Sequence, residues 1–339
     1  MNGQNQDASG KTLRGLSLDR SLLKRVSFIL VGLLGVGAAL VALTKTDDDP
    51  VDALLAEWPV VLGAGLLYLM GMVVYSISWA ALFEPGPSRR LIALGFLISQ
   101  PIKYLPGGIA QPIGQVTLTA QATGSSRSAL VAFPVHVLVN VVAAVTLGAP
   151  ILFVIDLPSW AGWLVVLVPI TWAALDRRWM SGLLGWLGRL HRVFAVGGEL
   201  PAQPRINRAF ALGLGAHATM FASFGLLTAS SVRGWSALEL SVVYAVAWLI
   251  GYIAIPAPAG LGARETVLAV ILSAQLAAGG VVRISAVHRI ATLVVELLLL
   301  VAALILARGF LGRRSRLGEA LTDSRSQIST EEAERSTHD

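Results

Sequence analysis

The sequence predicts an all-α integral membrane protein, and three observations lead to this class. Of the 339 residues, 55% are hydrophobic and only 14% are charged, which gives a mean hydropathy of +0.70. The apolar residues form runs long enough for helices to cross a hydrocarbon core of about 30 Å. Two of these runs are broken by proline and glycine. We therefore expect a polytopic helical bundle with six to eight crossings, in which two broken or re-entrant helix hairpins form an inverted repeat.

The apolar runs place the membrane spans along the chain. The first run, 26–43, follows two basic residues and has no clear small-x-small cleavage site before Thr44, so we expect a span and not a signal peptide. Further spans are expected at 58–83, 129–154, 162–175, 210–230 and 284–307. The two interrupted segments, 91–120 and 238–278, lie between these spans.

The basic residues predict the orientation of the chain. The formal net charge is +6, but Lys and Arg stand between apolar runs as short clusters, which indicates membrane topology and not nucleic-acid binding. If each interrupted segment enters and leaves on the same side, most of the 26 Lys and Arg residues fall on one face. By the positive-inside rule that face is cytoplasmic. We expect a multi-pass protein of a bacterial plasma membrane with both termini in the cytoplasm.

The two breaks, 103–108 and 255–260, occupy matching places in the two halves of the chain. A shift of 152 residues without a gap places Pro106 on Pro258, Gly108 on Gly260 and His136 on His288. By the expected topology the first segment enters from the cytoplasm and the second from outside, as in an inverted repeat. Irregular backbone is tolerated at bilayer depth only where it is buried in protein or lines a cavity. The breaks therefore predict a transporter-type binding site.

The remaining segments complete the domain organisation. Residues 176–208 form a cytoplasmic linker, in which Trp and Leu alternate with Arg as in a helix lying on a membrane surface, with a plain linker helix as the alternative. The tail is polar and is expected to be disordered. The predicted order is a cytoplasmic N-terminal segment (1–25), a first membrane repeat (26–175), the linker (176–208), a second membrane repeat (209–314) and a disordered cytoplasmic tail (315–339).

The residues around the breaks suit an anionic head group. A half-helix that starts after proline presents unpaired N–H groups and a positive dipole end, and glycine lets a ligand approach the backbone. Lys103 and Arg264 add positive charge, and Arg264 can bind a phosphate in bidentate fashion. The alternatives are that Lys103 snorkels to the interface and that Arg264 forms a structural clamp with Glu265. Glu265 could also recognise an amine or carry a proton. The candidate substrate-binding residues are Lys103, Tyr104, Pro106, Gly107, Gly108, Pro258, Gly260, Gly262, Arg264 and Glu265.

A second polar group lies in the last predicted span. His288 and Glu296 are eight residues apart, so they share a helix face about 12 Å apart along the axis. Glu296 falls near mid-span, where a carboxylate needs a partner or a proton. It is therefore a candidate for proton coupling, and the alternative is a buried ion pair or hydrogen bond with Arg289 or another helix. Histidines in membranes also serve as interhelical hydrogen-bonding groups. The candidate proton-coupling or polar-groove residues are His136, Asn140, His288, Arg289 and Glu296.

The loops Lys103-Tyr104-Leu105-Pro106-Gly107-Gly108 and Gly260-Leu261-Gly262-Ala263-Arg264-Glu265 resemble the two signature loops of the flippase-like membrane domain. This domain also forms the membrane part of lysyl-phosphatidylglycerol synthases, and the resemblance runs over about 22–314. It implies translocation of a lipid, such as an aminoacylated phospholipid or a polyprenyl-linked sugar. The synthases carry a further cytoplasmic aminoacyl-transferase domain, whereas this chain ends soon after its last span. Lipid synthesis is therefore expected in a separate partner enzyme.

The chain also departs from the pattern of that family. The second loop reads Pro258-Ala259-Gly260 where Pro-Gly-Gly is common, and Gln111 and Gln115 stand in a region where a basic residue is often found. His136 stands where an acidic residue is expected. The resemblance therefore does not transfer the identity of the lipid.

The sequence thus favours a flippase-like transporter of an anionic lipid or lipid-linked head group over an enzyme. Two alternatives stay open: a membrane enzyme or accessory subunit that acts on a phospholipid or polyprenyl phosphate, and a proton-coupled ion antiporter. Gly10-Lys11-Thr12 lacks the preceding glycine of a phosphate-binding loop, because Asn5 holds that position. The sequence contains no cysteine and no metalloprotease or serine-hydrolase motif, so no metal or cofactor is expected.

Overall fold

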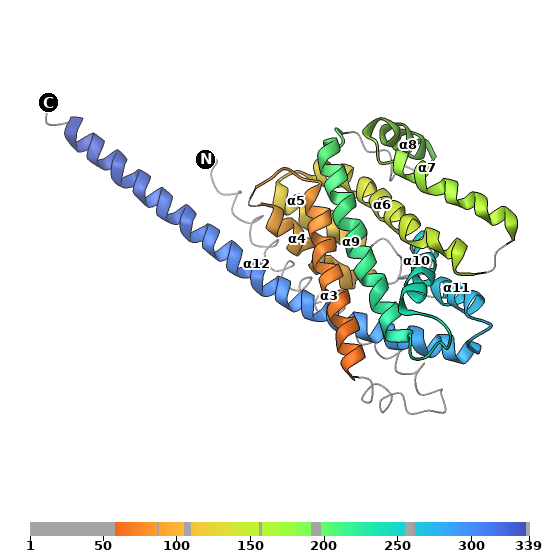
Figure 1. Ribbon diagram of the computed structural model, residues 1–339. Helices are drawn as coiled ribbons and strands as arrows, with labels where there is room; N and C mark the ends of the chain where they lie inside the picture. Colours follow the sequence, from red (N-terminus) through yellow and green to blue (C-terminus); the bar gives the residue numbers. More distant parts are fainter. Residues whose placement is uncertain are drawn as a thin grey trace, which may run out of the picture.

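A computed structural model of the chain describes residues 58–86, 88–104, 110–155, 158–190, 198–254, 260 and 262–336. Within these ranges the chain forms ten α-helices, α3 to α12, three 3-10 helices and no strand (Figure 1). The all-α class is therefore confirmed for the described part. The predicted N-terminal segment 1–25 and the first predicted span, 26–43, lie outside it.

Among the described residues, four helices are long and apolar enough to cross a membrane. They are α3 (Trp58–Ala81), α6 (Ser126–Gly148) together with the 3-10 helix η2 (Ala149–Phe153), α9 (Gln203–Thr228), and the first part of α12 (Ala278–Ser336). They coincide with the spans predicted at 58–83, 129–154, 210–230 and 284–307. The structure therefore indicates a multi-pass membrane protein.

Each interrupted segment forms two shorter helices on either side of a break. The first consists of α4 (Ser88–Ser99), the 3-10 helix η1 (Gln100–Tyr104) and α5 (Ala110–Thr123). The second consists of α10 (Ala237–Ile253) and α11 (Ala263–Ile271). The loops 105–109 and 255–259 lie outside the described residues. The same is therefore true of four predicted site residues: Pro106, Gly107, Gly108 and Pro258.

The helices of the two halves correspond to one another in sequence and in packing. The shift of 152 residues carries α3, α4, α5 and α6 onto α9, α10, α11 and the start of α12. Helices α3 and α9 pack together, and α3 begins at the end of the bundle where α9 finishes (Figure 1). Helix α12 packs on α3 and α4, and α6 packs reciprocally on α9 and α10. The last long helix of each half thus packs against the first two helices of the other half.

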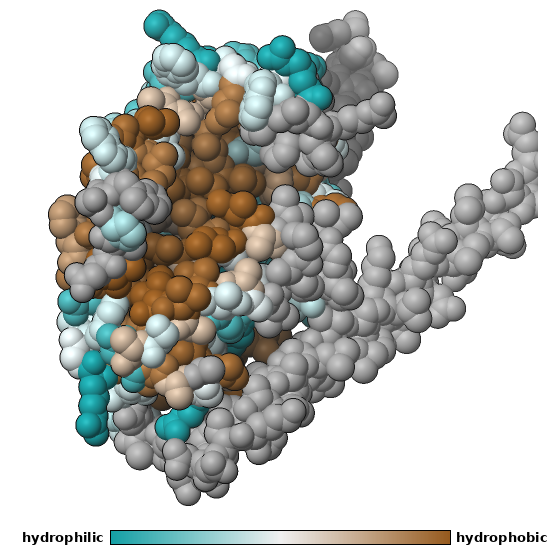
Figure 2. All heavy atoms as spheres, turned by 90° about the vertical axis from the view of Figure 1, so that its right-hand side faces the viewer, coloured by the Kyte–Doolittle hydropathy of each residue, from teal (hydrophilic) through white to brown (hydrophobic). Residues whose placement is uncertain are grey.

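The outer surface of the bundle is apolar along its long helices. On α3, every third or fourth side chain is exposed and apolar, whereas the opposite face contributes the buried residues Tyr68, Met72, Tyr75 and Trp79. The exposed apolar residues of α3 include Leu62, Leu66, Met70, Val73 and Ile77. Figure 2 shows a broad apolar belt on one side of the molecule with polar atoms above and below it. Such a belt is suited to hydrocarbon and not to water.

The segment between the two halves differs in part from the predicted span 162–175. It begins with the 3-10 helix η3 (Ser159–Val166) and continues in α7 (Leu167–Ala173), so its helical part is short. A complete crossing needs about 20 residues of α-helix. Helix α8 (Arg177–Leu190) follows, with Met180 buried and Trp179 and Trp186 exposed.

The C-terminal tail is helical where the sequence predicts disorder. Helix α12 continues to Ser336 and extends away from the bundle (Figure 1). After Gly318 the chain contains neither glycine nor proline, and it combines four Glu residues with four Ser and three Thr. Glycine and proline are the residues that oppose a helix most strongly, so a polar composition without them is no reason for the helix to end.

The close contact between α9 and α10 predicts a stability defect in Gly225→Ala. The added methyl would lie 2.0 Å from the Ala237 carbonyl oxygen and 2.2 Å from Ser241 Oγ, so the two helices would have to separate. We expect the free energy of unfolding to fall by about 1 to 3 kcal/mol, as in other overpacked interiors, with a lower thermal midpoint in detergent. Gly215→Ala on the same helix is the control, because nothing lies within 4 Å of its added methyl. Equal thermal midpoints for the two variants would show that α9 and α10 do not pack closely at Gly225.

Candidate functional site

The candidate site lies where both interrupted segments meet α12. Helix α12 packs against α4 and η1 from the first segment and against α11 from the second. It carries three of the predicted polar residues, His288, Arg289 and Glu296. The side chains at the ends of the two broken segments therefore reach a common helix.

The first contact is an ion pair between Lys103 and Glu296. Lys103 lies in η1 just before the first break, and its Nζ is 2.5 Å from Glu296 Oε1. The same oxygen accepts a hydrogen bond of 2.5 Å from the Tyr68 hydroxyl on α3. The Glu296 side chain is fully buried, whereas Lys103 is 26% exposed. Lys103 therefore points to a buried carboxylate and is the partner that Glu296 requires.

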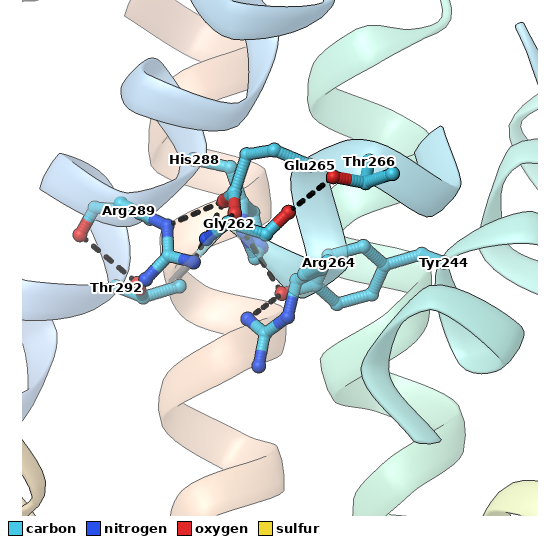
Figure 3. Close-up of polar contacts among 8 residues, drawn as sticks. All are labelled: Tyr244, Gly262, Arg264, Glu265, Thr266, His288, Arg289 and Thr292. Carbon is cyan, nitrogen blue, oxygen red and sulfur yellow. Dashed lines mark hydrogen bonds and ion pairs between the residues drawn. The ribbon is translucent and has the colours of Figure 1, made fainter. Parts of the chain in front are cut away.

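The second contact is an ion pair between Glu265 and Arg289. Glu265 Oε1 accepts hydrogen bonds from Arg289 Nε and Nη2 at 2.9 and 2.7 Å. Its Oε2 accepts the Gly262 N–H at 2.8 Å and so caps the first turn of α11. Figure 3 shows Glu265 and Arg264 leaving the start of α11 in different directions. The alternative of an Arg264–Glu265 clamp is therefore wrong, because adjacent helical residues point about 100° apart.

Arg264 is the cation of the cluster that has no carboxylate partner. Its Nη1 donates to the Tyr244 hydroxyl at 2.8 Å, and the guanidinium carbon lies 5.4 Å from the centre of the Tyr244 ring. Within the part of the chain that the structure describes, no carboxylate lies within ion-pair distance of Arg264. In Figure 3 its other terminal nitrogen points away from the residues drawn. The guanidinium thus keeps hydrogen-bonding capacity for a ligand.

Tyr244 links Arg264 to His288. The Tyr244 oxygen is 3.3 Å from His288 Nδ1 and already accepts a hydrogen bond from Arg264. The Tyr244 proton can therefore be donated to His288 Nδ1, which places the imidazole proton of a neutral His288 on Nε2. That Nε2 atom is buried without a hydrogen-bond partner in the described structure. His288 thus supplies a neutral donor beside the charged groups.

Two glycines shape the backbone at the second break. Gly260 has a φ of +71° and Gly262 a φ of +84°, a region that residues with a Cβ atom rarely adopt. A Cβ on Gly260 would also lie 2.9 Å from the Gly251 carbonyl oxygen in the last turn of α10. The chain therefore lies directly against α10 as it enters α11, and this contact places Arg264 beside Tyr244.

The predicted polar groove is divided into two separate clusters. His136 and Asn140 on α6 lie among α3, α4 and α9, where His136 stacks on Tyr75 and Asn140 Nδ2 donates to the Tyr75 hydroxyl at 2.6 Å. His217 on α9 contacts the same Tyr75 ring edge-on, with centroids 5.1 Å apart. None of the described contacts of His136 and Asn140 reaches Glu296, so the structure does not bring all the predicted groove residues together.

Two residues of the site, Tyr68 and Tyr244, were not predicted from the sequence. Each lies inside a helix that is apolar along most of its length. Tyr68 could have been found, because Tyr68, Tyr75 and Trp79 follow helical spacing on one face of α3. Tyr104, which was predicted, lies within electrostatic range of Glu296, Arg289 and Arg264. The described residues contain no group of three or more metal-ligating side chains.

No protein-family model matches the chain, and no curated protein matches its sequence. The resemblance to the flippase-like membrane domain therefore stays a hypothesis. The chemistry of the site must be inferred from its own residues.

The Lys103–Glu296 pair predicts a large stability effect. Lys103→Met leaves a buried carboxylate without its cation, which costs about 3 to 5 kcal/mol in other proteins. We expect the free energy of unfolding in detergent to fall accordingly, and Lys103→Met/Glu296→Gln to recover part of the loss because no charge is stranded. Arg205→Met is the control, since Arg205 pairs with the exposed Glu84, and such pairs contribute at most about 1 kcal/mol. Similar losses in Lys103→Met and Arg205→Met would show that Glu296 does not depend on Lys103.

Proposed function

We propose that the protein moves an anionic lipid head group between the leaflets while the acyl chains stay in the bilayer. The observation that carries the proposal is Arg264, a guanidinium inside an apolar bundle without a carboxylate partner among the described residues. A charge at membrane depth is costly unless it is paired or used. The other two cations of the cluster are neutralised by Glu296 and Glu265. An anionic ligand is therefore the partner that Arg264 lacks.

The backbone around Arg264 supports the same ligand. Helix α11 begins at Ala263, so the positive end of its dipole lies beside the Arg264 side chain. Directly before it, Gly262 has nothing within 4 Å of the position of a Cβ atom, which leaves the approach to the backbone open at this residue. A guanidinium together with a helix N-terminus is suited to phosphate. A lipid phosphate is the anion that is available within a bilayer.

We place the site between the halves of an inverted repeat, with α3 to α6 in one half and α9 to α12 in the other. The offset of 152 residues, the opposite directions of α3 and α9 and the reciprocal packing of α6 and α12 support this arrangement. The proposal includes six to eight crossings, re-entrant breaks and cytoplasmic termini in the cell membrane. The exposed Trp179 and Trp186 on α8 suit a helix at the membrane surface.

The ion pairs provide a means of coupling transport to conformation. Lys103–Glu296 and Glu265–Arg289 attach the two breaks to α12. Protonation of Glu296 would weaken its attraction for Lys103 and free the first break. Glu265 follows Arg264 in the chain and lies within electrostatic range of it. A phosphate bound to Arg264 would therefore repel the Glu265 carboxylate. Both events weaken an ion pair made by α12, so ligand binding and protonation would both change how this helix is held.

A proton-coupled ion antiporter is the second candidate function. The observation that favours it is Glu296, which is fully buried, paired with a lysine and has one carboxylate oxygen without a partner in the described structure. Buried carboxylates in membrane proteins often carry protons. An antiporter would use Glu296 for its ion, whereas a flippase would use Arg264 for its ligand.

The flippase proposal predicts that Arg264→Ala strongly slows lipid movement. We expect proteoliposomes to exchange fluorescent anionic phospholipid between leaflets, and the variant to be slower by roughly tenfold or more, because a charge-assisted contact contributes about 1.5 to 3 kcal/mol. Arg264→Lys should retain part of the rate. Arg205→Gln is the control, since Arg205 is a half-buried arginine that pairs with the exposed Glu84 away from the cluster. Unchanged exchange in folded Arg264→Ala would remove Arg264 from the function.

The coupling role of Glu296 predicts the pH response. We expect the transport rate of the wild type to vary with pH, and Glu296→Gln, which resembles the protonated carboxyl, to give a flat profile. Glu84→Gln is the matched control at an exposed position. A pH response that persists in Glu296→Gln would place coupling at another group. Proton-driven ion flux that depends on Glu296, without lipid exchange, would favour the antiporter.

A further inference from the structure

The positive and negative side chains of the charged cluster do not balance, and the net charge that remains restricts the choice of ligand. It contains three cations, Lys103, Arg264 and Arg289, and two carboxylates, Glu265 and Glu296. The two ion pairs account for both carboxylates, which leaves one positive charge on Arg264. The described part of the cluster therefore has a formal charge of +1 before a ligand binds. The sequence positions 105–109, 255–259 and 261 contain no ionisable residue.

The other polar groups of the cluster add hydrogen bonds and no charge. Uncharged hydroxyl groups come from Tyr68, Tyr244 and Tyr104. His288 is also neutral if the Tyr244 hydroxyl donates its proton to His288 Nδ1. Three buried atoms of the cluster lack a partner in the described structure. Arg264 Nε belongs to the charged guanidinium; the other two are His288 Nε2, which is then a donor, and Glu296 Oε2, which is an acceptor. One donor and one acceptor suit a group that both donates and accepts, such as a hydroxyl.

We infer that the preferred substrate is a lipid with a single phosphodiester charge and a neutral, hydroxylated head group, and not a phosphomonoester or a diphosphate. The inference rests on the proposed function and narrows it. A phosphodiester neutralises Arg264 and leaves the buried cluster without net charge. A phosphomonoester or diphosphate brings at least one further negative charge, which has no free cation in the cluster and must lose its water. A zwitterionic head group adds an ammonium for which no free carboxylate remains.

The test measures exchange of three fluorescent lipids with identical acyl chains in phosphatidylcholine proteoliposomes at pH 8. The probes are phosphatidylglycerol with one charge, phosphatidic acid with close to two charges at this pH, and phosphatidylcholine with none. We expect phosphatidylglycerol to exchange about tenfold faster than phosphatidic acid, which corresponds to a difference of about 1.4 kcal/mol. This ratio in the wild type decides the inference, even if a variant fails to fold.

Variants of the second ion pair test whether charge is the cause. Glu265→Gln raises the cluster to +2, so the ratio of the phosphatidylglycerol rate to the phosphatidic acid rate should fall at least fivefold. Glu265→Gln/Arg289→Gln restores +1 and should restore the ratio. Glu84→Gln, at an exposed site, should leave the ratio unchanged. The charge argument would be overturned if Glu265→Gln folds and leaves the ratio of the phosphatidylglycerol rate to the phosphatidic acid rate unchanged.

Two outcomes separate this inference from the proposed function. If phosphatidic acid exchanges as fast as phosphatidylglycerol and both require Arg264, the protein is a lipid translocator but the single-charge preference is wrong. If none of the three lipids exchanges faster than in protein-free liposomes, both the inference and the proposed function are overturned.

Discussion

A charge that leaves water for the interior of a membrane bundle needs a partner, and this constraint organises the centre of the molecule. Glu296 is fully buried on α12 and is held by Lys103 and Tyr68, which belong to the first half of the chain. Glu265 begins α11 and binds Arg289 on α12. Both broken segments are therefore attached to one helix by ion pairs.

Close helix packing holds the partners of these charges in place. On α3, a Cβ at Gly71 would lie 2.5 Å from Met220 Cγ on α9, so α9 packs directly against this glycine. Small residues commonly allow such approach in membranes, where water does not drive helices together. Tyr68 lies one helical turn before Gly71, and its position against Glu296 depends on this contact. Packing between α9 and α10 through Gly225 fixes Tyr244 in the same manner. Close packing between helices, and not the conformation of loops, therefore positions the tyrosine hydroxyl groups of the site.

The sequence predicts the long helices well because hydropathy is a strong and local signal. The spans in α3, α6, α9 and α12 and both interruptions follow from it, whereas α7 is shorter than predicted and the tail is helical. Charge partners are not local. Glu296 and Lys103 are far apart in the chain, and only tertiary structure selects this pair over Arg289. Glu265 pairs with Arg289 and not with its neighbour Arg264, because adjacent residues diverge around the helix. The residue types of the site were predictable, but their pairing was not.

The spacing of the two anchors on α12 has a mechanical consequence. Arg289 and Glu296 are seven residues apart, close to two helical turns, so they lie on one face about 10 Å apart along the axis. They hold partners from opposite halves of the chain and have opposite charges. A displacement of α12 along its axis changes both ion pairs together, and neither break can shift far without disturbing the pair of the other. In the inverted repeat proposed above, this coupling would join the two sides of the membrane through a single helix. The unpaired charge of Arg264, next to Glu265, is the place where a bound anion would bias that displacement.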